Sequence, residues 1–195
     1  MRAKVRIFEV FSKYPTIFIN FVLFKYDKNI LNMRPIRLIC TLSLLTLFCC
    51  SAFAQIPPVK VENRAGREIS ASSIVDGKTP AIISFWAVTC DPCIQELDAI
   101  SESMEDWQQE VGFRVVAIST DDVRHIAKAK ALTRGHMWDS FTLIFDPNSA
   151  LKRAMNVVDT PQVFIIDKDG KIVYSHTGYT PGSEKELLKV LKTLK

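Results

Sequence analysis

Residues 81–93 read AIISFWAVTCDPC, and this stretch holds the two features that decide the interpretation of the fold. The first feature is the run from Ala81 to Trp86, in which only Ser84 is not apolar. A short and nearly continuous apolar run is typical of a strand that is buried on both faces. The second feature is the C-x-x-C pair formed by Cys90 and Cys93. We therefore expect both cysteines to lie directly after a central strand.

A long helix is expected immediately after the cysteines. Apolar residues recur at steps of three or four, which is one face of a helix of about five turns; they are Ile94, Leu97, Ile100, Met104, Trp107 and Val111. The segment from Phe113 to Ser119 is a second apolar run and predicts another buried strand. Strand, helix and strand in this order form a βαβ unit, which is nearly always right-handed.

Further elements are expected on both sides of this βαβ unit. Asp121-Asp122 is expected to cap the helix that follows the unit. In chain order they are a β-hairpin at Val59–Val61 and Arg67–Ile69, a helix at Asp122–Arg134, a strand at Phe141–Phe145, a short helix ending near Met155, strands at Gln162–Asp167 and Lys171–His176, and a helix after Ser183. The pattern predicts an α/β fold with a central mixed β-sheet and helices on both faces.

The position of the cysteines carries chemical meaning. Backbone N–H groups and the helix dipole at a helix N-terminus favour negative charge, so a thiolate is stabilised there. Pro92 gives up only a backbone donor that the first helical turn leaves unpaired in any case. In such a pair one thiolate attacks a disulfide, and the second thiol resolves the mixed disulfide that results.

Two other interpretations of the cysteine pair remain open at this point. The pair could supply half of a structural zinc site, but there is no second C-x-x-C, and His125, His136 and His176 are isolated from one another in the sequence. The pair could also form an inert structural disulfide, although so short a ring adds little loop-closure entropy.

Two segments resemble the thioredoxin superfamily. Residues 85–93 (FWAVTCDPC) resemble its F-W-A-x-W-C-x-P-C core, and residues 160–170 (TPQVFIIDKDG) resemble its proline segment. Together with the leading hairpin, the helix–strand insertion at residues 122–145, Glu96 and a secretion signal, they identify the chain as a member of the TlpA/ResA-like branch. The resemblance covers roughly residues 56–195.

The resemblance implies a role for each matching residue. It makes Cys90 the attacking thiolate and Cys93 the buried resolving thiol, and it places a cis peptide bond before Pro161. No bound cofactor is implied, because the dithiol itself carries two electrons. The surface that receives a client protein is expected to include Trp86, Asp91, Pro92, Thr160 and Pro161.

Glu96 is a candidate for moving the proton of the resolving thiol. It lies three residues after Cys93, so on a helix the two side chains share a face. The alternative interpretation of Glu96 is a solvated glutamate on the protein surface, which is the usual case for a glutamate on a helix. Cytoplasmic thioredoxins have a buried aspartate just before the F-W pair, where this chain has Ser84, whereas the TlpA-like branch has a glutamate at the position of Glu96.

Two residues beside the cysteines bear on the choice of substrate and on whether the protein acts as a reductant or an oxidant. Thr89 stands where most relatives have an aromatic residue, which shrinks the apolar rim around the reactive sulfur. Asp91 places a negative charge next to Cys90, which opposes thiolate formation. A less stabilised reduced form means a more reducing pair, so we expect a reductant.

The N-terminal 54 residues are expected to direct export. Residues 33–54 combine a basic start, an uncharged and mostly apolar run from Leu38 to Cys50, and Ala52-Phe53-Ala54 as a cleavage site. They predict a signal peptide, with an uncleaved membrane anchor as the alternative. Residues 1–32 are interpreted as an upstream extension, with translation starting at Met33, and residues 55–195 as the thioredoxin-like domain.

The net charge of +4 belongs to this prefix. It carries eight of the 25 Lys and Arg residues and two of the 21 Asp and Glu residues, so the remainder has 17 basic and 19 acidic residues. A nucleic-acid partner for the folded part therefore lacks support.

The function predicted from the sequence is a thiol–disulfide oxidoreductase that is periplasmic or otherwise extracytoplasmic. We expect a monomer that takes electrons from a donor at the membrane and reduces disulfides in client proteins, for example in cytochrome c maturation. A peroxiredoxin-like peroxidase is the first alternative, but it needs Thr or Ser three residues before the attacking cysteine, where this chain has Ala87. The second alternative is a Sco-like copper-binding assembly protein, which would have three residues between the cysteines and a partner histidine such as His136.

Overall fold

The computed structural model describes residues 55–136 and 138–195. The expected upstream extension (residues 1–32) and signal peptide (residues 33–54) lie outside the described residues. Within the described ranges, no helix is long and apolar enough to cross a membrane.

The elements of this part of the chain follow the expected order. They are β1 (Lys60–Asn63), β2 (Glu68–Ser70), the 3₁₀ helix η2 (Ala71–Ile74), β3 (Ala81–Trp86), α4 (Asp91–Glu110), β4 (Arg114–Ser119), α5 (Ile126–Gly135), β5 (Thr142–Phe145), α6 (Ala150–Ala154), β6 (Gln162–Ile166), β7 (Ile172–Thr177) and α7 (Glu184–Lys192).

The strands form one mixed sheet in the order β2-β1-β5-β4-β3-β6-β7. The pairs β3–β4 and β4–β5 are parallel, and the other neighbours are antiparallel. Every residue of β3 is buried, as the apolar run from Ala81 to Trp86 predicts. The strand that leads to the cysteines is therefore fixed on both sides and on both faces, which gives the site a rigid base.

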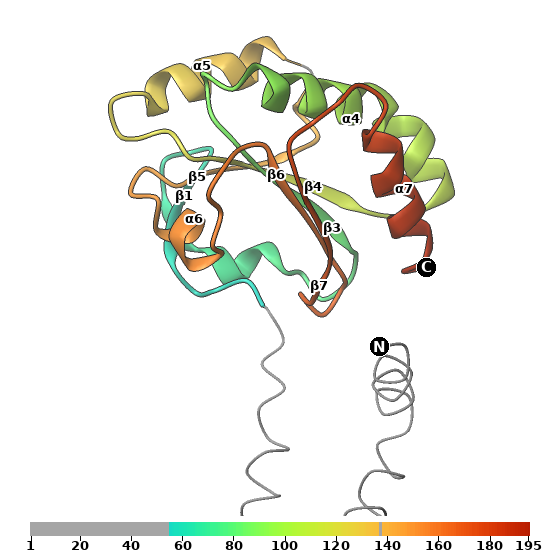
Figure 1. The fold of residues 1–195 in the computed structure, drawn as a ribbon. Coiled ribbons are helices and arrows are strands. Elements are labelled where there is room, and N and C mark those ends of the chain that lie inside the picture. Colours follow the sequence, from blue (N-terminus) through green and yellow to red (C-terminus); the bar gives the residue numbers. More distant parts are fainter. Residues whose placement is uncertain (1–54, 137) are drawn as a thin grey trace, which may run out of the picture. The chain divides into compact units, whose positions relative to one another are not determined.

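Helices cover both faces of the sheet (Figure 1). Buried residues of α4, α5 and α7 pack with one face in a core that includes Leu97, Ala129 and Leu187. The opposite face packs against η2 and α6, through Ala71 and Leu151 among others. The predicted mixed sheet with helices on both faces is confirmed, as are the leading hairpin and the helix–strand insertion.

The boundaries of the insertion differ from the prediction. The helix begins at Ile126 rather than at Asp122, because the Asp122 carboxylate accepts the backbone N–H groups of Arg124 (3.0 Å) and His125 (3.2 Å) and closes a turn there. The N-cap residue of the helix is His125, which makes no side-chain cap hydrogen bond, so the expectation that Asp122 caps the helix is wrong.

Candidate active site

The two cysteines form a disulfide at the start of α4, with their Cα atoms 5.3 Å apart. Cys90 is the N-cap residue of the helix, and its carbonyl accepts the backbone N–H groups of Cys93 (3.1 Å) and Ile94 (3.2 Å). Cys93 is completely buried, whereas Cys90 is only partly buried. The two sulfurs therefore differ in access: an incoming group can approach from the side of Cys90 only.

Asp121 holds the turn that carries Cys90. The backbone N–H of Val88 donates to both carboxylate oxygens of Asp121 (3.2 and 3.1 Å), and the Ser119 hydroxyl donates to Oδ2 (2.8 Å). Asp121 is buried, and β3 and β4 end side by side with Trp86 opposite Ser119. The expectation that Asp121 caps the following helix is therefore wrong, because its carboxylate reaches across to the neighbouring strand end instead.

The proline segment lies at the same edge of the sheet as the cysteine turn. Phe85 of β3 pairs with Gln162 of β6 in antiparallel register, so Pro161 lies beside the end of β3 from which the turn departs. The Thr160–Pro161 peptide bond is cis, as the resemblance implies. The carbonyl of Pro161 accepts the backbone N–H of Gly178 (2.8 Å), which ties this segment to the end of β7.

The residues expected to contact a client differ in exposure. Asp91 and Pro92 are exposed in the first turn of α4, Thr160 is half-buried, and Pro161 is buried. Trp86 is fully buried, with its ring 5.2 Å from that of Trp138 in an edge-to-face contact. The expectation that Trp86 contacts a client is not supported, because β3 is covered on both faces.

Glu96 is not a surface glutamate. It is fully buried, although it carries an ionisable group on the helix that begins at the cysteines. Its Oε1 lies 2.8 Å from Nε2 of His176, and its Oε2 has no hydrogen-bond partner among the described residues. Burial raises the pKa of Glu96 above its ordinary value and outweighs the opposing hydrogen bond and charge of His176.

Sequence reasoning missed His176. It lies 80 residues after Glu96 and has no motif around it, so it was interpreted only as an isolated histidine. One signal was present. His176 follows Ile172 and Tyr174 at steps of two in a predicted strand, which puts the three side chains on one face, and in the structure this is the partly buried face of β7.

The other histidines do not join the cysteines in a metal site. Nδ1 of His136, the candidate copper ligand, lies 2.8 Å from Oδ1 of Asp98, and that same oxygen accepts the indole N–H of Trp138 (2.8 Å). In residues 55–136 and 138–195, no group of three or more His, Cys, Asp and Glu side chains is placed to hold a metal ion.

The fold and the Cys90–Cys93 disulfide, with a cis proline at the same sheet edge, define the class of thioredoxin-like proteins with a C-x-x-C disulfide. The chain belongs to the AhpC/TSA family, whose model matches residues 53–175.

Individual relatives agree with this class. An uncharacterized thioredoxin-like protein from Porphyromonas gingivalis, solved in solution, is 44% identical; the match covers 73% of this chain and 92% of that one, with a TM-score of 0.65. The thiol:disulfide interchange protein DsbE of Yersinia pestis is 27% identical over 63% of this chain and 62% of its own length. The thiol-disulfide oxidoreductase ResA of Bacillus thuringiensis is 25% identical over 49% of this chain and 53% of its own. The chain thus spans less than two thirds of these two curated relatives.

Proposed function

We propose that the chain is an extracytoplasmic thiol–disulfide oxidoreductase that reduces disulfides in client proteins, for example during cytochrome c maturation. The observation that carries the proposal is the asymmetric disulfide at the start of a 20-residue helix, with Cys90 accessible and Cys93 sealed. The chain would work as a monomer, without a bound cofactor, and would receive electrons from a donor at the membrane.

The reaction needs only the two sulfurs and a place for one proton. The Cys90 thiolate attacks one sulfur of a client disulfide, the client S–S bond breaks, and the first client thiolate leaves. The Cys93 thiol loses its proton and attacks the Cys90 sulfur, so that the Cys90–Cys93 bond forms and the second client thiolate leaves. Two electrons have then passed from the dithiol to the client.

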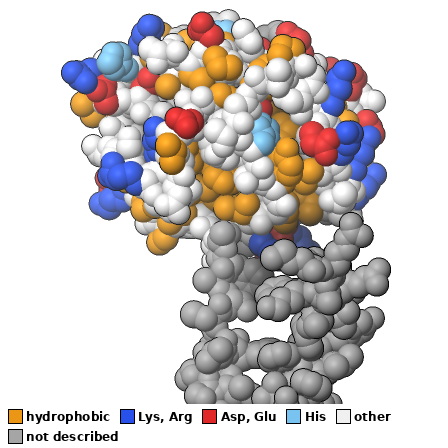
Figure 2. Space-filling model, viewed as in Figure 1, with side chains coloured by type: hydrophobic (Ala, Val, Ile, Leu, Met, Phe, Trp, Pro, Cys, Tyr) orange, Lys and Arg blue, Asp and Glu red, His pale blue; other side chains and the backbone are white. Residues whose placement is uncertain are grey.

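The surroundings of the disulfide suit an extended client chain. Thr160, beside the cis bond, is partly exposed and offers backbone groups next to the cysteine turn. Val158, two residues earlier, is 78% exposed and adds apolar surface. Figure 2 shows hydrophobic side chains gathered over the middle of the face where Figure 1 shows β6 and β7, with charged side chains mainly around it. An apolar centre with a polar rim favours a protein partner over a small ionic substrate.

Asp91 supports reduction as the direction of the reaction. It is exposed in the first turn of α4, next to the residue that would carry the thiolate. A negative charge there disfavours the Cys90 thiolate and so raises the reducing power of the pair. We expect a reduction potential closer to that of thioredoxin (about −270 mV) than to that of DsbA (about −120 mV). A value near the DsbA figure would contradict this direction, and Asp91→Asn is expected to form its thiolate at lower pH.

The test of the function is covalent trapping in the native compartment. Without the resolving thiol the mixed disulfide persists, so Cys93→Ala is expected to accumulate clients bound to Cys90 that reducing agents release. Cys90→Ala is the matched control and is expected to trap nothing. If Cys93→Ala traps no more than Cys90→Ala, the proposal is wrong. Peroxide turnover with a thiol donor would point to the peroxidase alternative instead.

The proposal that the protein is exported rests on its N-terminal sequence, and it can be tested separately. The relatives named DsbE and ResA are thiol–disulfide proteins, and the prefix has the pattern of a signal peptide. N-terminal sequencing of the extracytoplasmic protein is expected to begin at Gln55, after Ala54. A mature protein that keeps residues 33–54 would show that this segment serves as an anchor.

A further inference from the structure

The two edges of the sheet are built differently. The edge strand β2 has only three residues and carries Glu68, which pairs with Lys60 of β1 (2.7 Å). The edge strand β7 has six residues (IVYSHT) and holds no Lys, Arg, Asp, Glu or Pro. Natural proteins usually protect an edge strand by making it short or by placing charges, bulges or proline on it. The register irregularity of β7 lies at its beginning, near Ile166, so Tyr174–Thr177 form a regular and unprotected edge.

The backbone of this edge offers hydrogen bonds to a further strand. Gly178 donates its N–H to the carbonyl of Pro161 (2.8 Å), and in an antiparallel pair the bonded and non-bonded positions alternate. The N–H and C=O groups of Ser175 and Thr177 therefore point away from β6, and no other strand of the described residues lies on that side. An extended polypeptide satisfies outward groups that recur every two residues.

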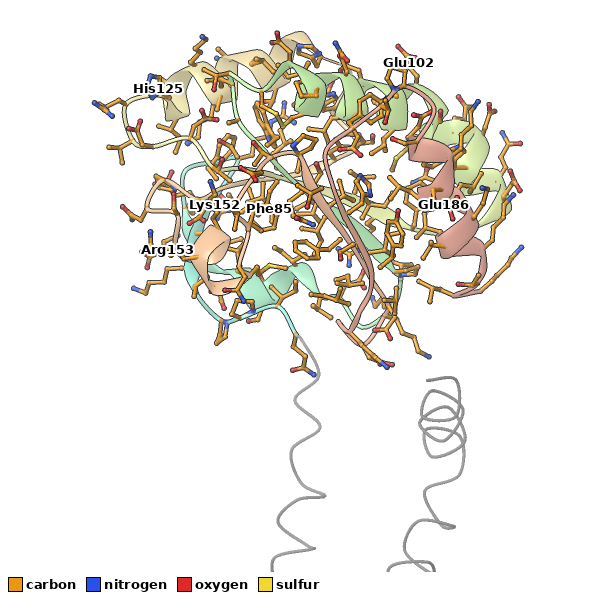
Figure 3. All side chains as sticks on the ribbon, viewed as in Figure 1. Phe85, Glu102, His125, Lys152, Arg153 and Glu186 are labelled. Carbon is orange, nitrogen blue, oxygen red and sulfur yellow. A yellow bond between two sulfur atoms is a disulfide. The ribbon has the colours of Figure 1, made fainter. Side chains whose placement is uncertain are left out.

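A groove of about 810 Å³ borders this edge. It is lined by residues of β7, of the loop that leads to α7 (Figure 1) and of α7 itself, where Figure 3 labels Glu186; they include Tyr174, His176, Lys185, Glu186 and Lys189. Tyr174 and His176 lie on one face of β7, because side chains two residues apart on a strand point the same way. A strand added beside β7 would therefore direct every second side chain toward the groove.

The rim of the groove favours an acidic partner. Lys185 and Lys189 are exposed one helical turn apart on α7, and Lys189 pairs with Glu186 (2.7 Å). Lys185 has no ion-pair partner among the described residues, so its charge is available to a carboxylate of a bound chain. Glu184 is buried and already accepts the Tyr179 hydroxyl (3.0 Å).

The groove adjoins the site of the cysteines. Its residue Gly178 is bonded to Pro161, and β3, β6 and β7 are neighbours with Phe85, Gln162 and Thr177 at one level. Strands lie about 4.8 Å apart, so a strand added to β7 would lie about 15 Å from the axis of β3. About five extended residues span that distance, so one client chain can reach both places.

We propose that the free edge of β7 binds an extended acidic segment of the client protein as a further strand of the sheet, with alternate side chains in the groove beside α7. This inference rests on the proposed function, and it adds a second contact that holds the client while its disulfide reacts at Cys90.

Two substitutions at one position separate backbone pairing from side-chain contact. Ser175→Pro removes an N–H that β6 does not use, and proline is tolerated on an edge strand where the N–H faces solvent. Ser175→Ala keeps that N–H and is the matched control. Urea midpoints of both variants check that the fold is retained.

The probe is a synthetic peptide with one cysteine, held as a mixed disulfide with thionitrobenzoate. A five-residue Gly-Ser spacer joins the cysteine to a five-residue segment of alternating Glu and Val, in the two possible orders, and a short peptide lacks the segment. The reduced full chain is oxidised to the Cys90–Cys93 disulfide as the peptide disulfide is reduced to the peptide thiol and thionitrobenzoate, whose absorbance is followed.

The segment is expected to lower the half-saturating peptide concentration of the wild type by about 10-fold or more and to leave the maximal rate unchanged, because a second contact raises the effective concentration of the disulfide. Ser175→Pro is expected to lose this advantage and to match the wild type on the short peptide. Ser175→Ala is expected to match the wild type on both.

Two further arms test the pairing and the charge. Peptides N-methylated at alternate residues of the segment are expected to lose the advantage in one frame, which faces β7, and to keep it in the other; this arm needs no change in the protein. Lys185→Glu is expected to weaken the acidic peptide by about fivefold at low salt and to favour a peptide with Lys in place of Glu.

The outcomes are distinct. Equal half-saturation by the peptides with and without the segment, or equal effects of N-methylation in both frames, would overturn the role of β7 and leave the function standing. A reduced wild type that releases thionitrobenzoate from none of the peptides would instead overturn the proposed function. A dimer in sedimentation that Ser175→Pro dissociates would assign this edge to a second copy of the chain and overturn its assignment to the client.

Discussion

Two of the three histidine–carboxylate pairs in the described residues differ in burial and in the other donors around the carboxylate. Glu96 and His176 approach to 2.8 Å, and Asp122 and His125 to 2.9 Å. The side chain of Glu96 is completely buried, whereas that of Asp122 is 39% exposed. Burial raises the pKa of Glu96, but hydrogen bonds from Arg124 first and His125 second lower the pKa of Asp122 to about 2.

This difference teaches that a partner histidine does not by itself decide whether a carboxyl group is ionised. At Asp122 water solvates the charge, so each added donor further favours the ionised form. At Glu96 the loss of water outweighs the single donor, and the proton is held more tightly. A proton-transfer group needs the second environment, because an acid that is ionised down to a pH of about 2 has no proton to give in neutral solution.

The largest effect is expected on the rate of the resolving step when Glu96 is replaced. Glu96→Gln keeps the size of the side chain and can still bond His176, but it cannot take the Cys93 proton. We expect the resolving step to slow by about 10²-fold, which is the low end for loss of a general acid or base. Acid-quenched single turnovers measure that step.

Asp122→Asn is the control for this substitution, since it removes the carboxylate of an exposed histidine pair. It is expected to resolve the mixed disulfide within about twofold of the wild type, because surface pairs contribute little. Equal slowing in both variants would show that the contrast in burial has no bearing on catalysis.

A second effect concerns stability and compares two adjacent carboxylates. Asp121→Ala leaves the Val88 N–H and the Ser119 hydroxyl without their partner in a buried turn. The expected loss is about 1–3 kcal/mol, the usual result of leaving a buried donor unpaired. Asp122→Ala removes only exposed hydrogen bonds and is expected to lose less. Urea midpoints of the oxidised proteins measure both, and the reverse ranking would contradict the assigned role of Asp121.

The sequence predicted the parts of the fold and site that local pattern determines. The run from Ala81 to Trp86 and the three- and four-residue steps after Cys93 specify a strand and a helix without knowledge of anything distant. The cysteines fall at their junction, so their place could be predicted as well. The cis bond before Pro161 could not be predicted from its own residues and came from the resemblance.

What could not be predicted depends on register across the sheet. His176 meets Glu96 only because β7 pairs with β6, and β6 with β3, in one particular alignment. Asp121 meets Val88 only because β3 and β4 end at the same level. A one-residue shift in either pairing would separate these groups, and no local pattern encodes such a shift.

A third prediction uses the raised pKa of Glu96. A carboxyl that binds its proton more tightly when folded contributes stability at low pH and loses it as pH rises. The oxidised wild type should therefore lose stability from about pH 4.5, the ordinary value for a glutamate, up to the raised pKa, and stay level above it. Each unit by which folding raises the pKa corresponds to about 1.4 kcal/mol of stability.

Glu96→Gln has no such proton and is expected to lack this decline. Its stability relative to the wild type should therefore rise with pH across that window, as followed by urea midpoints between about pH 4 and 8. A relative stability that falls with pH would mean that the buried carboxyl is held as a paired anion rather than as an acid.

The smallest effect is expected at Asp122. Its contribution to stability changes with pH in the opposite direction to that of Glu96. Because the pKa of Asp122 is lowered to about 2, its contribution is present above the ordinary value of 3.8 and is lost as pH falls from 3.8 toward 2. Asp122→Asn should therefore differ from the wild type by a constant amount above about pH 5, and the difference should shrink in acid. Added salt should reduce it too, because the group is exposed to solvent. Denaturation midpoints between about pH 2 and 6 measure this trend. If Glu96→Gln and Asp122→Asn changed with pH in the same direction, burial would not be what separates the two histidine–carboxylate pairs.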